Sequence, residues 1–330
     1  MSIIEMKILH IILSEALSGS EKYVIDLANF QSKKHNVLIV NLRSPFDLEI
    51  KKSLRSNIKL LTINRFFKSF AIKKIIKKEN PEIVHTHLGE AAKIIKKKWG
   101  NFKLITTMHM NYKHKYFKKF DAIICSNNTQ KKEIQKKFKG QIFRLNLWPI
   151  NSKKEKKFSK KLNTSKKKFI FGSIGRFHKQ KGFEFLADTF DKYKIPNTIL
   201  ILIGDGYEKY KKKYIHNKSI KIMGYKKNTN YYYNKFDTFV ITSVWESFGI
   251  TLLEAMKNRL PIITTVHEGN KDWIKKFNLT KIKINNEKDL KNALVKHSTA
   301  KKRRIRYNLT EFSYGNICNK ILVIYQKIIT

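Results

Sequence analysis

Two glutamates stand in one short stretch, "SVWESFGITLLEAMKNRLP" (residues 243–261). The apolar run before it predicts a strand that ends at a loop carrying Glu246, and Glu254 then lies about two turns along a helix. A carboxylate in a cleft needs hydrogen-bond donors, which sugar hydroxyls supply, and a helix N-terminus offers backbone amides to a phosphate. The stretch is therefore typical of a nucleotide-sugar site, although a surface helix with two glutamates is the alternative.

Two cations follow a second predicted strand, in "GRFHKQKGFEFL". Arg176 and Lys181 stand near a helix start, where an arginine fork, a lysine point charge and helix amides could together hold a diphosphate. The alternative is that they are two of the 70 lysines and arginines of the chain. Arginine is rare here, which favours the diphosphate interpretation.

Three further loops carry polar residues. Gly19 lies in "LSGSEKYVIDLA", a turn opening a helix whose amides could receive a phosphate, although such a turn needs no ligand. His109 directly follows an apolar strand, where it could meet a substrate hydroxyl or phosphate, or be a structural histidine. His85 and His87 share one strand face by their period-two spacing, and the pattern offers no third residue to complete a metal site.

Short apolar runs alternate with helical segments along the whole chain. Such alternation predicts βαβ units and, here, two doubly wound parallel sheets in an α/β fold. Parallel sheets bind ligands beyond the carboxyl ends of their strands, so the loops described above are where chemistry is expected. The predicted strands lie in 7–13, 36–42, 58–63, 82–88, 103–109 and 121–127, and then in 168–176, 197–206, 219–225, 237–243 and 260–265.

A highly charged segment separates the two series of strands. Residues 150–168 contain almost no apolar side chains and predict a linker, so we expect domains over residues 1–150 and 151–330. The tail, "FSYGNICNKILVIYQKII", has apolar residues at helical spacing. It predicts a closing helix that could pack back on the first domain.

Composition limits the class of protein. With 330 residues and 42% hydrophobic residues the chain can bury two cores, and its net charge of +45 suggests either a polyanionic partner or a compositional bias towards lysine. Two distant cysteines predict neither a disulfide framework nor a zinc site, and they fit the reducing cytoplasm. No apolar run reaches the ~18 residues of a membrane-spanning helix, and we find no nucleic-acid-reading motif.

Taken in order, these motifs resemble glycosyltransferase family 4, whose members are retaining enzymes with the GT-B fold. "SVWESFGITLLEAMKNRLPII" resembles the family's E-x7-E region, "SGSEKYVIDLA" its N-terminal glycine loop, "PEIVHTHL" its histidine-containing strand and "GRFHKQKG" its diphosphate motif. The likeness covers essentially the whole chain. It implies two Rossmann-like domains facing a cleft, an acceptor-binding domain over 1–150 and a nucleotide-sugar-binding domain over 151–330.

The resemblance also implies roles for single residues. Glu246 matches a contact to donor-sugar hydroxyls and Glu254 a contact to the ribose, while Arg176 and Lys181 match the pair that stabilises the diphosphate. His109 matches a histidine near the donor sugar. Other positions expected near the donor are Gly19, Gly175, Tyr225, Ser247, Phe248, Gly249 and Ile250. The implied reaction transfers a sugar from a nucleoside diphosphate sugar, with UDP the expected nucleotide, without a metal ion.

Two positions depart from the family pattern: Ser18 replaces a glycine of the first loop, and Arg259 stands where glycine is common. The expected acceptor is a glycan or glycolipid of the cell surface. As a hypothesis, the aromatic and basic segment 111–120, "NYKHKYFKKF", contacts anionic lipid at the inner face of the membrane, with an ordinary solvated helix as the alternative. Less favoured functions are a related nucleotide-sugar epimerase or phosphorylase, and a basic nucleic-acid-binding protein.

Overall fold

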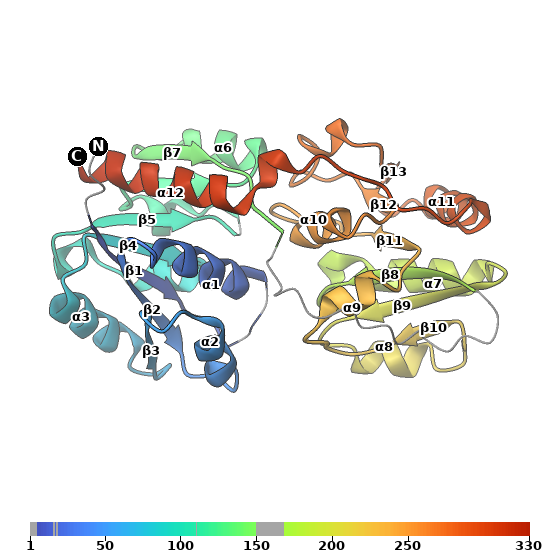
Figure 1. Ribbon diagram of the computed structural model, residues 1–330, viewed down its shortest axis with the longest axis horizontal. Coiled ribbons are helices and arrows are strands. Elements are labelled where there is room, and N and C mark those ends of the chain that lie inside the picture. Colours follow the sequence, from blue (N-terminus) through green and yellow to red (C-terminus); the bar gives the residue numbers. More distant parts are fainter. Residues whose placement is uncertain (1–4, 16, 18, 110, 150–167) are drawn as a thin grey trace. The chain divides into compact units, whose positions relative to one another are not determined.

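The computed structural model describes residues 5–15, 17, 19–109, 111–149 and 168–330 (Figure 1). The chain forms two compact units: unit 1 comprises residues 1–150 and 310–330, and unit 2 comprises residues 151–309. The linker expected over 150–168 lies outside the described residues except for Lys168. The closing helix belongs to unit 1, so the chain returns to its first unit after completing the second.

Unit 1 is built on a seven-stranded parallel sheet with the order β3-β2-β1-β4-β5-β6-β7 in its described residues. Alternate side chains enter the cores on its two faces: helix α3 packs Ile72 and Ile76 on one face, and Tyr325 of α12 reaches His85 on the other. The elements are β1 (Lys7–Ile12), α1 (Gly19–Gln31), β2 (Asn36–Leu42), α2 (Asp47–Ser53), β3 (Lys59–Ile63), α3 (Lys68–Glu79), β4 (Ile83–His87), α4 (Gly89–Ile94), β5 (Lys103–Thr107), α5 (His114–Phe117), β6 (Ala122–Cys125), α6 (Asn128–Gln135), β7 (Gln141–Arg144) and α12 (Tyr314–Ile329).

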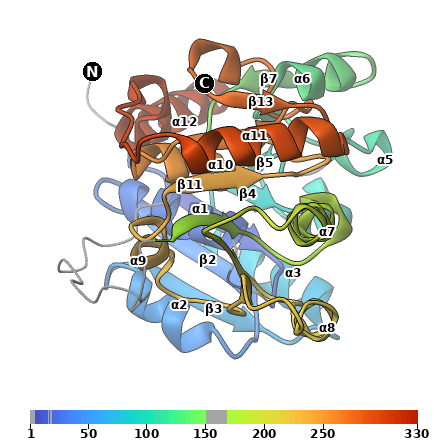
Figure 2. The ribbon, with the colours of Figure 1, turned by 90° about the vertical axis from the view of Figure 1, so that its right-hand side faces the viewer.

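Unit 2 is built on a six-stranded parallel sheet with the order β10-β9-β8-β11-β12-β13 in the part of the chain that the structure describes. Helices α7 and α9 lie on opposite sides of this sheet (Figure 2). The elements are β8 (Phe169–Ile174), α7 (Phe183–Tyr193), β9 (Thr198–Ile203), α8 (Glu208–Lys213), β10 (Ile220–Ile222), α9 (Thr229–Tyr233), β11 (Thr238–Ile241), α10 (Ile250–Lys257), β12 (Ile262–Thr265), β13 (Thr280–Ile282) and α11 (Glu287–Thr299).

The two doubly wound parallel sheets predicted from the sequence are confirmed, and every predicted strand is present. Strands β7 and β13 were not predicted. In each sheet the strand order reverses at one place, between β1 and β4 and between β8 and β11. The loops after β8 and β11 therefore leave neighbouring strands at the switch point of unit 2, which is where open parallel sheets receive ligands.

Two further observations concern membranes. Among the described residues, no helix combines the length and the apolar character needed to span a bilayer. The segment 111–120 does not present its aromatic rings to a surface in the way we expected, because Tyr112, Phe117 and Phe120 are all buried in the core of unit 1. Tyr116 is half-buried, and of the four aromatic side chains only Tyr116 and Phe117 lie on the short helix α5 (His114–Phe117).

Candidate active site

An ion pair joins the two loops at the switch point of unit 2. Lys181 closes a short 3-10 helix (Lys179–Lys181) after β8, and its Nζ lies 2.9 Å from Oε2 of Glu246 in the loop after β11. The Ser243 hydroxyl donates to the other carboxylate oxygen, Oε1, at 2.7 Å. Both oxygens of a glutamate that is only 8% exposed therefore have partners. The residues that the sequence singled out in two separate motifs are neighbours in the structure.

The electrostatics keep this carboxylate charged. Burial raises the pKa of Glu246, but the Lys181 ammonium, His267 and the hydrogen bond from Ser243 outweigh burial, and the net shift is downward. His267 follows β12, and burial is the main cause of its lowered pKa, partly opposed by Glu246. A fixed anion with a fixed cation beside it can accept a hydroxyl hydrogen bond and attract a phosphate at the same place.

Hydrogen bonds to backbone carbonyls hold the two loops together. The Val244 amide donates to the Gln180 carbonyl, and the Gln180 side chain donates to the Trp245 carbonyl, each at 2.9 Å. On the far side, Gly269 packs against the Glu246 backbone so closely that a Cβ there would lie 1.9 Å from the Glu246 carbonyl oxygen. Only glycine fits at that position, and the loop that carries Glu246 is therefore fixed by its neighbours rather than by its own sequence.

The second glutamate lies on α10, whose N-terminus follows directly on the Glu246 loop. Gly249 precedes the helix with φ of 100°, a left-handed conformation that favours glycine, and so the chain turns sharply into α10. The Tyr233 hydroxyl donates to Oε2 of Glu254 at 2.8 Å. Burial, followed by the Glu254 charge, raises the pKa of Tyr233, so this hydroxyl keeps its proton and orients the carboxylate.

The other predicted residues of unit 2 differ in their exposure. Arg176 is exposed, and within the described part of the chain no hydrogen bond or ion pair engages its guanidinium. Tyr225 is 44% exposed after β10. Phe248 is buried and stacks on Trp273 with ring centroids 5.3 Å apart, so its side chain is structural and only its backbone is available to a ligand. Gly175 lies in the loop after β8 and Ser247 in the loop after β11, and Ile250 is the first residue of α10.

Arg259, one of the two departures from the family pattern, lies just after α10 with φ of 59°. This is the left-handed region, which favours the glycine that the family pattern has there and costs roughly 1 kcal/mol for a residue with a Cβ. Its carbonyl accepts from the Ile305 amide at 2.7 Å, which helps to hold the strained conformation. Ser18, the other departure, lies outside the described residues.

The remaining predicted residues, His109 and Gly19, belong to unit 1. Gly19 begins α1, and His109 follows β5 with Tyr23 edge-on to its ring at 5.0 Å. Burial lowers the pKa of His109 to about 4, an effect that Glu21 partly opposes, and no partner for its buried Nε2 occurs among the described residues. His109 is thus a neutral imidazole whose Nε2 is not engaged by any residue that the structure describes. That state suits a hydrogen bond to a ligand.

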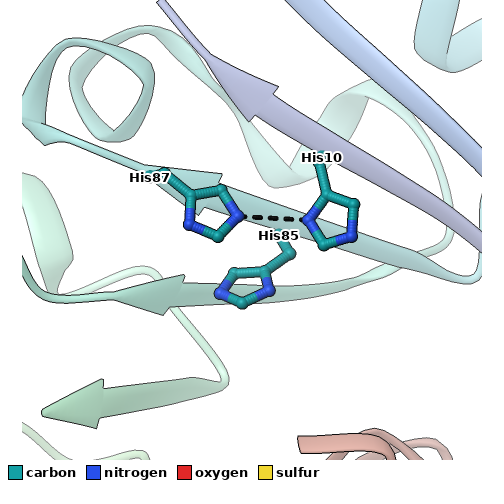
Figure 3. A group of neighbouring side chains, drawn as sticks. All are labelled: His10, His85 and His87. Atoms are coloured by element: carbon teal, nitrogen blue, oxygen red, sulfur yellow. Dashed lines mark hydrogen bonds between the residues drawn. The ribbon is translucent and has the colours of Figure 1, made fainter. Parts of the chain in front are cut away.

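The structure adds a third histidine to the pair on β4. His10 of β1 is in register with His85, and one ring nitrogen from each of His10, His85 and His87 lies within 4.8 Å of the others, as a metal site requires (Figure 3). Hydrogen bonds within the protein already engage these imidazole rings, so their arrangement needs no metal ion to explain it. His10 contacts Gln31 at 2.7 Å and His87 at 3.1 Å, and His85 contacts Tyr325 and Thr107.

Burial lowers the pKa of all three histidines, to about 4 for His10, so the group is uncharged at neutral pH. Within the described part of the chain, every ring nitrogen of the three except Nδ1 of His87 has a partner. The cluster could accept a transition metal only by giving up some of these contacts. We interpret it as a neutral hydrogen-bonded layer inside unit 1.

Sequence reasoning missed three contributors to this chemistry: Ser243, Tyr233 and His267. Ser243 stands three residues before Glu246, and His267 directly follows an apolar run, so both had a signal of the kind that singled out His109. Tyr233 had none, because it lies on a separate helix and contacts Glu254 only in the folded chain.

Comparison with known proteins agrees with this geometry. Residues 154–309 match the family described as glycosyl transferases group 1, and residues 17–145 match glycosyltransferase family 4. The first match covers the loops with Lys181 and Glu246 and the helix with Glu254. The second begins after β1 and covers strands β2 to β7 of unit 1.

Individual relatives are also glycosyltransferases. An uncharacterised glycosyltransferase of Methanocaldococcus jannaschii is 31% identical over 60% of this chain, and the match spans 59% of that relative. The UDP-Gal:α-D-GlcNAc-diphosphoundecaprenol α-1,3-galactosyltransferase of Escherichia coli is 25% identical, with 88% of each chain covered. The crystal structure of a glycosyltransferase from Rickettsia africae superposes with a TM-score of 0.76 at 20% identity, over 99% of this chain and 100% of that one.

Proposed function

Because the chain is a glycosyltransferase with the GT-B fold, we propose that it transfers a sugar from a UDP sugar to a hydroxyl of a glycolipid acceptor with retention of anomeric configuration. The observation that carries the proposal is the buried pair of Lys181 and Glu246 at the switch point of unit 2. It combines a cation for a diphosphate with an anion for sugar hydroxyls. A site for nucleotide alone would need the first and not the second.

In this proposal Lys181 and the exposed Arg176 bind the diphosphate, with the backbone amides at the start of α10 beside them. Glu254, already oriented by Tyr233, accepts hydrogen bonds from the ribose. The backbone next to Tyr225 contacts the base. UDP is the nucleotide we favour because the Escherichia coli relative is named for a UDP sugar, and its glycolipid acceptor supports an acceptor of the same class here.

The chemistry follows from which groups are available. The bond from the anomeric carbon to the β-phosphate oxygen breaks, and the charge that develops on the diphosphate is stabilised by Arg176 and Lys181 in the role that a metal ion has in other transferases. The acceptor oxygen forms its bond on the same face of the sugar. Its proton passes to an oxygen of the departing phosphate, so the atoms and charges balance without a protein base.

Glu246 does not serve as the nucleophile in this scheme. Both of its oxygens are engaged, one by Lys181 and one by Ser243, and its lowered pKa makes it a weak nucleophile. Its role is to hold hydroxyls of the donor sugar in position. The neutral His109 is expected to donate or accept a hydrogen bond with the donor sugar, as the family resemblance implies.

A thermal-shift panel of UDP, GDP and ADP with their common sugar conjugates tests the donor site. Saturable stabilisation by uridine nucleotides alone is expected, since a ligand that binds only the native state raises the melting temperature by mass action. Glu254→Gln should reduce this shift, whereas Glu208→Gln, an exposed glutamate on α8, should not. Stabilisation by another base would overturn the nucleotide, and an equal loss in both variants would overturn the role of Glu254.

The product distinguishes the reaction. Incubation of donor and lipid-linked acceptor should give a glycoside with the anomeric configuration of the donor, read from the proton coupling of the anomeric carbon by NMR. An inverted product would refute retention. Conversion of the donor in the absence of acceptor would instead favour an epimerase.

A further inference from the structure

One turn of unit 1 exposes three phenylalanines together. Phe66, Phe67 and Phe70 are 89%, 69% and 70% exposed, although a soluble surface rarely gathers large apolar side chains in this way. They lie in the turn between β3 and α3 and in the first turn of α3 (Figure 1). A patch of neighbouring exposed apolar side chains is typical of a surface that binds another molecule.

The helix that follows places cations beside these rings. Ile72 and Ile76 of α3 point into the core, so the outward face is formed by positions three, four and seven residues after Phe70. These are Lys73, Lys74 and Lys77, all exposed. From residue 65 to residue 78 the sequence has six cations and no acidic residue.

The turn is held in place from both ends. Arg65 pairs with Glu15 at 3.2 Å, and Lys68 pairs with Glu90. The Asn64 side chain accepts from the Phe66 amide at 2.9 Å and fixes the turn itself. The backbone that carries the three aromatic side chains is therefore ordered before a partner binds. Binding does not have to order this backbone and so loses no further conformational entropy there.

We propose that this surface, the outward face of residues 65–78, docks the enzyme on an anionic lipid bilayer. Phenylalanine rings enter the boundary between headgroups and acyl chains, and lysines on the same helix face attract anionic headgroups, which is the combination that makes an amphipathic helix interfacial. An anionic bilayer fits both features, whereas an apolar protein partner would explain the rings and leave the lysines without complement. The proposal moves the membrane contact from residues 111–120, where Tyr112, Phe117 and Phe120 are buried, to residues 65–78.

Vesicle flotation of the full chain, without donor or acceptor, tests docking separately from sugar transfer. The protein should float with vesicles of phosphatidylcholine and phosphatidylglycerol at physiological salt, and only weakly with phosphatidylcholine alone. Replacing Phe66, Phe67 and Phe70 by serine should reduce the partition coefficient by more than about tenfold. The matched apolar control is Ile215→Ser with Val323→Ser, at side chains that are 79% and 61% exposed elsewhere.

The lysines have a control of equal charge. Replacing Lys73, Lys74 and Lys77 by glutamine should weaken binding by about 100-fold, since each basic residue near an anionic surface contributes about fivefold. Replacing Lys211, Lys212 and Lys218, exposed lysines of unit 2, removes the same net charge. Equal losses in the two triple variants would show that dispersed charge alone binds lipid and would overturn the proposal.

Two other results would also overturn it. The first is equal flotation with neutral and anionic vesicles. The second is a dimer in solution that the phenylalanine variant dissociates, because the surface would then be an interface between copies of the chain. Sugar transfer to a water-soluble acceptor should be unchanged in all these variants. A negative flotation result would therefore not contradict the proposed function. Absence of transfer activity would not prevent the flotation test.

Discussion

Replacement of Lys181 by methionine, which keeps most of the apolar stem, should both destabilise unit 2 and stop transfer. Two unit charges 2.9 Å apart attract by about 6 kcal/mol at an effective dielectric constant of about 20. Desolvation of the pair offsets part of this, and removing one partner of a buried pair typically costs about 3 to 5 kcal/mol. Because Ser243 and His267 still support Glu246, we expect the lower end of that range.

The destabilisation should depend on pH in a stated direction. In the native protein the Glu246 pKa is lowered, so the pair contributes stability above the ordinary carboxyl pKa and loses it as the pH falls. Without Lys181, burial is no longer outweighed and the folded-state pKa rises. The variant should then bind a proton on folding and become relatively more stable towards acid pH, the reverse of the native protein.

Hydrogen exchange of β11 and α10 amides, followed by mass spectrometry at pH 7 and pH 5, gives a readout confined to unit 2. The control is Lys179→Met, at an exposed neighbour. The double variant with Glu246→Gln removes the unpaired charge, so protection should recover while transfer stays abolished. Protection unchanged in Lys181→Met, or lower in the double variant than in the single one, would refute the reasoning.

Three other outcomes are expected. Turnover should be unchanged after dialysis against EDTA, because Arg176 and Lys181 are proposed to stabilise the leaving diphosphate; a loss restored by one added divalent metal would contradict this. Arg259→Gly should raise the free energy of unfolding by about 0.5 to 1 kcal/mol in urea titrations by removing left-handed strain, and a loss would contradict the strain. Burial lowers the pKa of His297 to about 4, so its contribution to stability is lost as the pH falls from its ordinary value towards 4. His297→Gln should flatten the loss of stability between pH 7 and pH 5 by about 1 to 2 kcal/mol; an unchanged slope would contradict a neutral His297.

Most of the fold could be predicted because parallel strands buried on both faces are nearly continuous apolar runs. The two strands that were not predicted, β7 and β13, are not continuous apolar runs buried on both faces. β7 and β13 lie at sheet edges and are short, and β13, "TKI", has only one fully buried side chain. The edge strands β3 and β10 were predicted from their apolar runs, whereas the sequences of β7 and β13 do not stand out from those of loops.

The sequence predicted those parts of the site whose residues lie within one short stretch of the chain. Glu246 and Glu254 share a stretch, and Lys181 lies in a motif of its own, but their relation depends on β8 and β11 being neighbours. Strand order is a property of the whole sheet, and no local pattern encodes it. The same holds for His10, which joins His85 and His87 through strand register.

Aromatic and basic segments show why exposure is the hardest feature to predict. "NYKHKYFKKF" and "RFFKSFAIKKIIKK" have the same kinds of residue, yet the first buries Tyr112, Phe117 and Phe120, whereas the second exposes its three phenylalanines. In the second, Ile72 and Ile76 already fill the inward face of α3, so the phenylalanines are surplus to its core contact. In the first, the rings are the only large apolar groups, and burying them is what attaches the segment to unit 1. A ring beside lysines therefore indicates a membrane contact only when other residues supply the core.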